Sequence, residues 1–95
     1  MFKKLDPLLH NELRLAVVAY LMAKQNVSFK ELKEVTNATA GNLSIQLKKL
    51  EQANYLTIHK SFKDNYPLTQ LNISKEGQHA FKIYFDALKS YTKTL

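Results

Sequence analysis

Hydrophobic residues recur every three or four positions in several stretches of this chain, a spacing that places them on one face of an α-helix. The clearest pattern spans residues 39–53, where Leu43, Leu47 and Leu50 form a single apolar stripe. Thr39 precedes the stripe and is a good N-cap, because its hydroxyl can accept a hydrogen bond from an unpaired N–H of the first turn. The pattern therefore predicts a helix that starts after Thr39 and buries its leucine face.

An earlier stretch, residues 12–24, carries apolar side chains around more than half of the helix circumference, which indicates a helix buried on two sides. Asn11 is the expected N-cap of this helix, and Glu12 is well placed at the positive end of the helix dipole. The apolar residues of this helix are Leu13, Ala16, Val17, Tyr20, Leu21 and Ala23.

Between these two helices, residues 28–31 match the capping box, in which a serine hydroxyl and a glutamate carboxylate each satisfy a free N–H. They predict a short helix over residues 29–35. A short connection then leads to the next helix, which is typical of a helix-turn-helix unit, here over residues 28–53. The inward side chains of the short helix are expected to be Phe29, Leu32 and Val35.

From residue 55 onward the hydrophobic period changes to two, the pattern of a half-buried β-strand. Residues 55–62 read as one strand and the segment around Leu71 as its return, with a polar, proline-containing turn over residues 63–68. The sequence thus predicts a β-hairpin over residues 55–73. Val27 is expected to form a very short strand of its own.

Ser74 is the expected N-cap of a final helix over residues 75–92, along which large apolar side chains recur at helical spacing. A small domain has little core left for so many large groups, so we expect this face to be a dimer interface. The alternative is that the helix folds back on its own domain. The predicted dimer-interface residues are Leu13, Val17 and Tyr20 in the first helix, and Phe81, Tyr84, Phe85, Leu88 and Tyr91 in the last.

Composition narrows the class of protein. The 95 residues fit one domain, residues 1–95, with a mainly α-helical α+β fold that contains a small β-hairpin. The net charge of +6 is frequent in domains that bind a polyanion. No stretch has the apolar length that a signal peptide or a bilayer span needs, so we expect a cytoplasmic protein without a membrane partner.

Catalytic and metal chemistry are not expected. The chain has no cysteine, which excludes a cysteine-based metal site, and its three histidines lie in different predicted elements. Nucleophile–base pairs, glycine-rich phosphate loops and metal-ligand spacings are absent from the sequence, so we expect neither an enzyme nor a bound cofactor.

The outward face of the 39–53 helix is small at its start, carries amides in its middle and is basic toward its end. A helix that enters the major groove of double-stranded DNA must be slim, must hydrogen-bond base edges and must carry cations beside the phosphates. This face therefore favours DNA binding. The alternative is an ordinary solvated surface, because lysine and glutamine face water on most helices.

The chain also resembles the small winged-helix transcriptional regulators related to the MarR and ArsR groups. The resemblance covers nearly all of the sequence, in the segments LDPLLHNELRLAVVAYL, FKELKEVTNATAGNLSIQLKKLEQANYLTIHKSF and LNISKEGQHAF. Its most specific part is the family pattern GNLS-x-x-LKKLE, here followed by Tyr55. The resemblance implies a winged helix-turn-helix with a C-terminal dimerisation helix, and a homodimeric DNA-binding regulator.

We expect the 39–53 helix to enter the major groove of a pseudo-palindromic operator. Gly41 would allow close approach, Asn42 would pair with an adenine edge, and Ile45 would pack on a thymine methyl group. The other predicted DNA-binding residues are Thr39, Ser44, Gln46, Lys48 and Lys49 in the helix, and Lys60, Lys63, Asn65 and Tyr66 in the hairpin.

An alternative is a winged-helix protein-interaction or dimerisation module without specific DNA binding. The hairpin tip favours it, because KDNYPLT lacks the glycine and arginines that are usual there in the family, and Ile45 is apolar on an outward face. A small-molecule effector pocket would be lined by Tyr20, Phe81 and Tyr84, although these are more simply core and interface residues.

Overall fold

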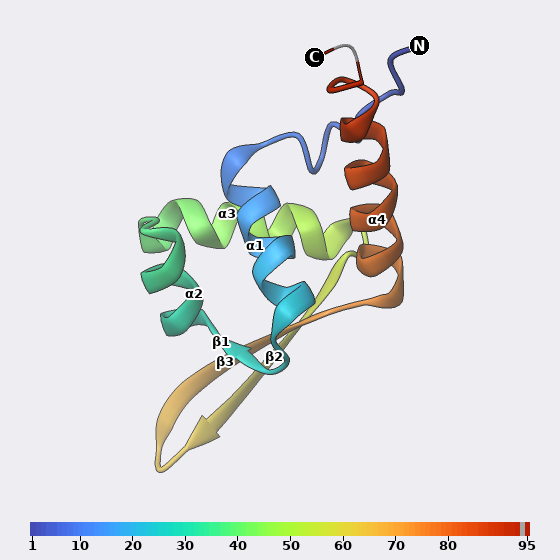
Figure 1. The fold of residues 1–95 in the computed structure, drawn as a ribbon. Helices are drawn as coiled ribbons and strands as arrows, with labels where there is room; N and C mark the ends of the chain where they lie inside the picture. Colours follow the sequence, from blue (N-terminus) through green and yellow to red (C-terminus); the bar gives the residue numbers. More distant parts are fainter. Residues whose placement is uncertain (94) are drawn as a thin grey trace.

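The computed structural model describes residues 1–93 and 95. Figure 1 shows a hairpin projecting from a group of helices, with α1 crossing in front of α3 and α4 standing beside them. The strands form one antiparallel sheet in the order β1-β3-β2. In chain order the elements are α1 (Glu12–Ala23), β1 (Val27–Ser28), α2 (Phe29–Thr36), α3 (Ala40–Gln52), β2 (Leu56–Lys63), β3 (Tyr66–Ile73) and α4 (Lys75–Lys89). The predicted α+β fold, mainly helical with one hairpin, is confirmed.

The core lies between the helices and the base of the sheet. The predicted stripe of Leu43, Leu47 and Leu50 is buried, with exposed fractions of 0%, 3% and 0%. Val27 of β1 pairs with Leu71 of β3, and both side chains are fully buried. The very short strand predicted at Val27 is therefore confirmed, and its burial joins the sheet to the helices.

The four predicted N-caps are confirmed: each side-chain oxygen accepts a hydrogen bond from the backbone N–H three residues later. These caps are Asn11, Ser28, Thr39 and Ser74. The predicted return contact of the Glu31 carboxylate in the capping box is wrong. That carboxylate instead binds the Lys24 ammonium group at 2.6 Å and accepts a hydrogen bond from the Tyr20 hydroxyl, because a cation is a stronger partner than a backbone N–H.

The two strands of the hairpin lie within the predicted range 55–73, but the turn between them is shorter than the predicted turn over residues 63–68. Only Asp64 and Asn65 form the turn, and both have a left-handed backbone, with φ of 52° and 66°. Asp and Asn tolerate this conformation, which a two-residue hairpin turn requires. In the second residue pair from the turn, Phe62 lies opposite Pro67. Pairs in an antiparallel ladder alternate between bonded and non-bonded, so Pro67 loses no hydrogen bond to β2 there.

Some predicted inward residues lie on the surface. Val35 has an exposed fraction of 51%, so its predicted inward position is wrong. Ala16 and Ala23, on the helix expected to be buried on two sides, are exposed in the single chain. The eight-residue α2 buries only Leu32 completely, because one short helix can turn only one narrow face to the core.

The helix α4 ends at Lys89, short of the predicted residue 92. Beyond it the chain turns and binds the N-terminal arm. The Lys3 N–H donates to the Ser90 hydroxyl, and the Tyr91 hydroxyl donates to the Lys3 carbonyl, each at 3.0 Å. The Phe2 and Tyr91 rings stack with centroids 5.0 Å apart. The two ends of the described chain consequently lie together, as Figure 1 shows.

Candidate nucleic-acid interface

The face of α3 opposite its leucine stripe is open to solvent. Ile45 has an exposed fraction of 56%, and a Cβ atom added to Gly41 would meet nothing within 4 Å. The predicted DNA-binding residues exposed on α3 or at its cap are Thr39, Gly41, Asn42, Ser44, Ile45, Lys48 and Lys49. Because the leucines anchor the other side of the helix in the core, this face is presented by a fixed element.

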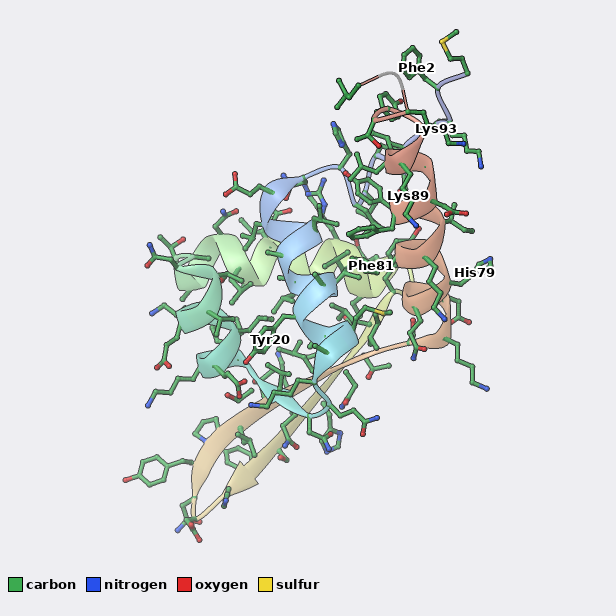
Figure 2. The ribbon with its side chains drawn as sticks, in the orientation of Figure 1. Phe2, Tyr20, His79, Phe81, Lys89 and Lys93 are labelled. Atoms are coloured by element: carbon green, nitrogen blue, oxygen red, sulfur yellow. The ribbon has the colours of Figure 1, made fainter. Side chains whose placement is uncertain are left out.

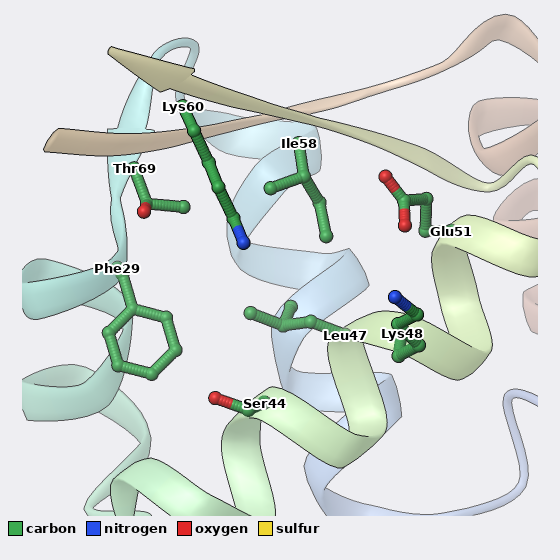
Figure 3. Close-up of a pocket in the computed structure, with 8 residues that line it drawn as sticks. All are labelled: Phe29, Ser44, Leu47, Lys48, Glu51, Ile58, Lys60 and Thr69. Carbon is green, nitrogen blue, oxygen red and sulfur yellow. The ribbon is translucent and has the colours of Figure 1, made fainter.

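A groove of about 630 Å³ lies between α3 and the hairpin. Figure 3 shows the Lys60 side chain extending from β2 toward α3, where Ser44 and Lys48 line the facing wall. Leu47 forms part of an apolar floor, and Glu51 contributes one carboxylate at the wall of α3. The other lining residues are Phe29, Ile58 and Thr69. The groove therefore combines two ammonium groups with one carboxylate on an apolar base.

Sequence reasoning missed several of these lining residues. Thr69 reaches the groove because it pairs with Lys60 across the hairpin. Residues paired across a ladder project from the same face of the sheet. The pairing of Lys60 with Thr69 could be predicted from the sequence only if the turn was placed at Asp64 and Asn65. Phe29 was expected to be a core residue and Glu51 had no predicted role.

Strand alternation divides the predicted hairpin residues between two faces. Lys60 faces the groove, whereas Lys63 lies three positions further and pairs with Tyr66, so these two project from the other face. Asn65 lies in the turn itself, and Tyr66 has an exposed fraction of 75%. The structure thus brings Lys60 together with α3 but places the other three residues at the far end of the hairpin.

Gln46 occupies a different environment from its neighbours on α3. It is only partly exposed, and its side-chain oxygen accepts a hydrogen bond from Nη1 of Arg14 in α1 at 2.5 Å. Its side-chain nitrogen donates to Oδ1 of Asn42 at 3.0 Å. Arg14 also donates from Nε to the Leu8 carbonyl at 2.6 Å. Gln46 therefore belongs to a chain of hydrogen bonds that reaches the open face through Asn42.

The groove lysines, Lys48 and Lys60, form no ion pair with any residue that the structure describes. Within the described residues, the single ion pair joins Lys24 to Glu31, away from the groove. Hydrogen bonds from Lys24 and then from Tyr20 hold the pKa of the Glu31 carboxyl below its usual value. Lys48 and Lys60 form no such pair in this part of the structure, so both are available to a phosphate.

The predicted dimer surface is only partly available. Phe85 and Tyr91 have exposed fractions of 48% and 39%, whereas Phe81 is half-buried beside Phe85, with ring centroids 5.2 Å apart. Figure 2 shows Phe81 on the side of α4 that faces α1, with His79 pointing away from it. The half-buried members of the predicted set also include Leu13, Tyr20 and Leu88.

Two predicted interface residues face inward. Val17 and Tyr84 have exposed fractions of 0% and 3%, so their assignment to a dimer surface is wrong. The Tyr84 hydroxyl lies 3.1 Å from Nδ1 of His10, because the arm that carries this histidine packs against α4. The hollow beside Phe81 is lined by neither Tyr20 nor Tyr84, so the three residues named for an effector pocket do not line this hollow together.

Comparison with known proteins agrees with this geometry. Residues 13–92 match the family model described as "Winged helix DNA-binding domain". An uncharacterized protein of Methanocaldococcus jannaschii is 33% identical over 82 residues, which cover 86% of this chain and 89% of that protein. The solved structure of a transcriptional regulator homologue from Pyrococcus horikoshii OT3 has a TM-score of 0.84 at 25% identity, covering 92% of this chain and 86% of that one. The S. aureus MepR–DNA complex has a TM-score of 0.71 at 16% identity, covering 88% and 68%, which shows a shared fold.

The chain belongs to the winged helix DNA-binding domain family. Its structural neighbours include MarR-family transcriptional regulators, so the resemblance seen in the sequence is confirmed. The family match and the structural neighbour from P. horikoshii together support a DNA-binding regulator. None of the helices in the described part of the chain is long and apolar enough to cross a membrane. No cluster of three or more metal-ligating side chains occurs among the same residues.

Proposed function

We propose that this regulator acts as a homodimer that inserts α3 into the major groove of a pseudo-palindromic operator. The observation that carries the proposal is the open outer face of α3 beside a groove into which Lys48 and Lys60 both project. An α-helix fits the major groove, and ammonium groups on either side of it contact the flanking phosphates. Gly41 lets the start of the helix approach the bases, because no atom of the described residues would lie within 4 Å of a Cβ added there.

The contacts divide by position on α3 and the hairpin. Asn42 and Ile45, exposed near the start of the helix, meet the base edges. Thr39, Ser44, Lys48, Lys49 and Lys60 bind phosphates, which fixes the register but reads no sequence. Lys63, Asn65 and Tyr66 at the hairpin end contact the backbone or minor groove beyond the site. Two such subunits would recognise half-sites about 10 bp apart or a multiple of that.

The dimer contact in this proposal is the outer surface of α4 with the adjoining arm. Phe85 is exposed on α4, and the exposed Phe2 of the arm stacks on Tyr91 just beyond the helix. A patch of large apolar groups on a small protein is typical of a partner surface. The alternative function, protein interaction without DNA, is favoured only by the apolar Ile45 on the open face and the weakly basic hairpin tip.

The test is the affinity for duplex DNA selected from a random pool, measured by fluorescence anisotropy as salt is raised. Counterion release predicts a linear fall of log K with log salt. The double variant Lys48→Glu, Lys49→Glu should bind much more weakly, with a slope smaller by about 2. The control Lys75→Glu, Lys93→Glu makes the same charge change outside the groove and should retain most of the slope. Equal behaviour of the two double variants would overturn the proposal.

A further inference from the structure

The side chains of Arg14, Gln46 and Asn42 form a hydrogen-bond chain with a fixed polarity. The guanidinium of Arg14 carries only donors. The Gln46 atom that faces it at 2.5 Å must therefore be the carbonyl oxygen Oε1, not the amide nitrogen. This leaves the Gln46 nitrogen to point at Asn42, where it requires an acceptor. It finds Oδ1 of Asn42 at 3.0 Å.

The free end of this chain is the amide nitrogen of Asn42, which is exposed on the outer face of α3. Asn42 lies in the first turn of α3, the part of a recognition helix that meets base edges. Without Gln46 the Asn42 amide could rotate by 180° and offer either its oxygen or its nitrogen. With its oxygen engaged, it offers two N–H donors instead.

Arg14 is held in place from the side opposite Gln46. Its Nε donates to the Leu8 carbonyl at 2.6 Å, and its own backbone N–H is bound by the Asn11 side chain that caps α1. It forms no ion pair with any residue that the structure describes. Two carbonyl oxygens, one from the arm and one from α3, therefore orient its charge, so the guanidinium is fixed before DNA is present.

We infer that Arg14 is a specificity-determining residue that makes Asn42 a hydrogen-bond donor toward the base it meets; this rests on the proposed function. Among major-groove edges, guanine offers two acceptors, N7 and O6. Adenine offers N7 beside a donor, and bidentate pairing with it needs the Asn42 oxygen turned toward the base, whereas here that oxygen faces Gln46. This hydrogen-bond chain from Arg14 through Gln46 to Asn42, here called the relay, thus changes the expected base. The sequence alone predicted adenine as the partner of Asn42, whereas the relay favours guanine.

The sharpest test is Gln46→Glu. A carboxylate has only acceptors, so it keeps the contact with Arg14 but must receive a hydrogen bond from Asn42. The Asn42 amide then turns its nitrogen inward and its oxygen outward. Base preference at that one position should change from guanine toward bases that present a donor, cytosine or adenine, by about tenfold in the ratio of affinities. The control Gln52→Glu adds the same charge at an exposed position of α3 outside the relay and should keep the guanine preference.

A DNA-free measurement separates the relay from the function. In ¹⁵N NMR spectra, the side-chain NH₂ protons of Asn42 should exchange rapidly in the wild type and become protected in Gln46→Glu. In Arg14→Met, which removes the donor, Gln46 should lose its protection. Unchanged Asn42 protection in Gln46→Glu would overturn the inference whatever the protein binds.

Measurements of DNA binding then test whether the relay affects base preference. If the wild type and Gln46→Glu rank the four bases identically although the relay has reversed, Arg14 has no specificity role and the inference fails while the proposed function stands. If the wild type shows no salt-dependent binding to any duplex, the proposed function fails, and Arg14 is a structural residue only. A reversed ranking in Gln46→Glu, but not in Gln52→Glu, supports both.

Discussion

A Cβ atom on Gly77 would lie 2.1 Å from the carbonyl oxygen of Tyr55. Tyr55 lies between α3 and β2, and Gly77 lies in the first turn of α4, so the segment that leaves α3 packs directly against the start of α4. The same Tyr55 oxygen accepts a hydrogen bond from the Ser74 N–H at 3.1 Å, which prevents it from moving aside freely. Glycine is required for space, since its backbone does not have positive φ.

We therefore expect Gly77→Ala to lower the free energy of unfolding by about 1–3 kcal/mol, the usual cost of forcing an extra methyl group into a packed site. Urea denaturation followed by circular dichroism measures it. The matched control is Gly41→Ala, where the methyl group enters open space and should stabilise the helix by about 0.5–1 kcal/mol. A Gly77→Ala protein as stable as the wild type would contradict the contact.

At Gly41 a larger substitution separates stability from binding. Gly41→Leu should leave the unfolding midpoint unchanged or raised, because nothing of the chain lies within 4 Å of the added Cβ. Its affinity for the selected duplex should fall about tenfold or more, because the side chain fills the space between helix and bases. Parallel thermal unfolding and anisotropy titrations provide the two readouts. Full affinity in this variant would mean that the start of α3 does not approach DNA closely.

The Tyr55 hydroxyl gives a prediction for alkaline pH. Burial, and then a hydrogen bond to Asp6 at 2.5 Å, raise the pKa of Tyr55 to about 12 from its usual 10.0. A raised pKa in the folded state means that the associated stability is complete below pH 10 and is lost as the pH rises toward 12. In Tyr55→Phe, the alkaline loss of stability should be smaller.

The ionisation itself can be followed by ultraviolet difference absorbance. One tyrosine should titrate near pH 12 in the wild type and be missing in Tyr55→Phe. In Asp6→Asn its pKa should fall only part of the way toward 10.0, because burial is the larger cause. A Tyr55 signal, identified as the one lost in Tyr55→Phe, centred near pH 10 instead of 12 would contradict the burial and the hydrogen bond.

The proposed dimer contact predicts that a charge weakens the dimer on one face of α4 but not on the other. Phe85→Glu should shift the protein toward monomer in sedimentation equilibrium, because a charge in an apolar interface is strongly unfavourable. Affinity for a two-half-site duplex should fall more than affinity for one half-site. Ile83→Glu is the matched control, since Ile83 is 52% exposed but lies two residues away, on the other side of the helix. A monomeric wild type, or equal effects of both variants, would rule out this interface.

The features that sequence reasoning predicted well are local ones. Each N-cap depends on one side chain and an N–H three residues away, so Thr39 and Ser74 could be assigned without knowledge of the fold. The leucine stripe of α3 is similarly a matter of helical period. Just past this helix, Asn54 has a left-handed backbone with φ of 63°, a conformation that asparagine tolerates at a helix end.

The features it missed depend on residues far apart in the chain. Tyr84 is buried because the arm brings His10 against it across 74 positions, which no helical pattern contains. The contact of Arg14 with Gln46 likewise spans 32 positions. Pro67 was predicted to lie in the turn, but it lies in β3 opposite Phe62, because the two-residue turn sets the register of the strands. Such contacts require the packed fold, whereas caps and stripes do not.

The most direct measurement is the location of bound DNA on the protein. Backbone ¹H–¹⁵N chemical shifts should be recorded while a selected duplex is added to the labelled regulator. We predict that the largest changes fall on the first turns of α3 and on the groove residues Lys48 and Lys60, with the exposed outer face of α2 at Val35 unaffected. Changes confined to α4 and the arm, with α3 silent, would contradict the central claim that this helix is the DNA-reading surface.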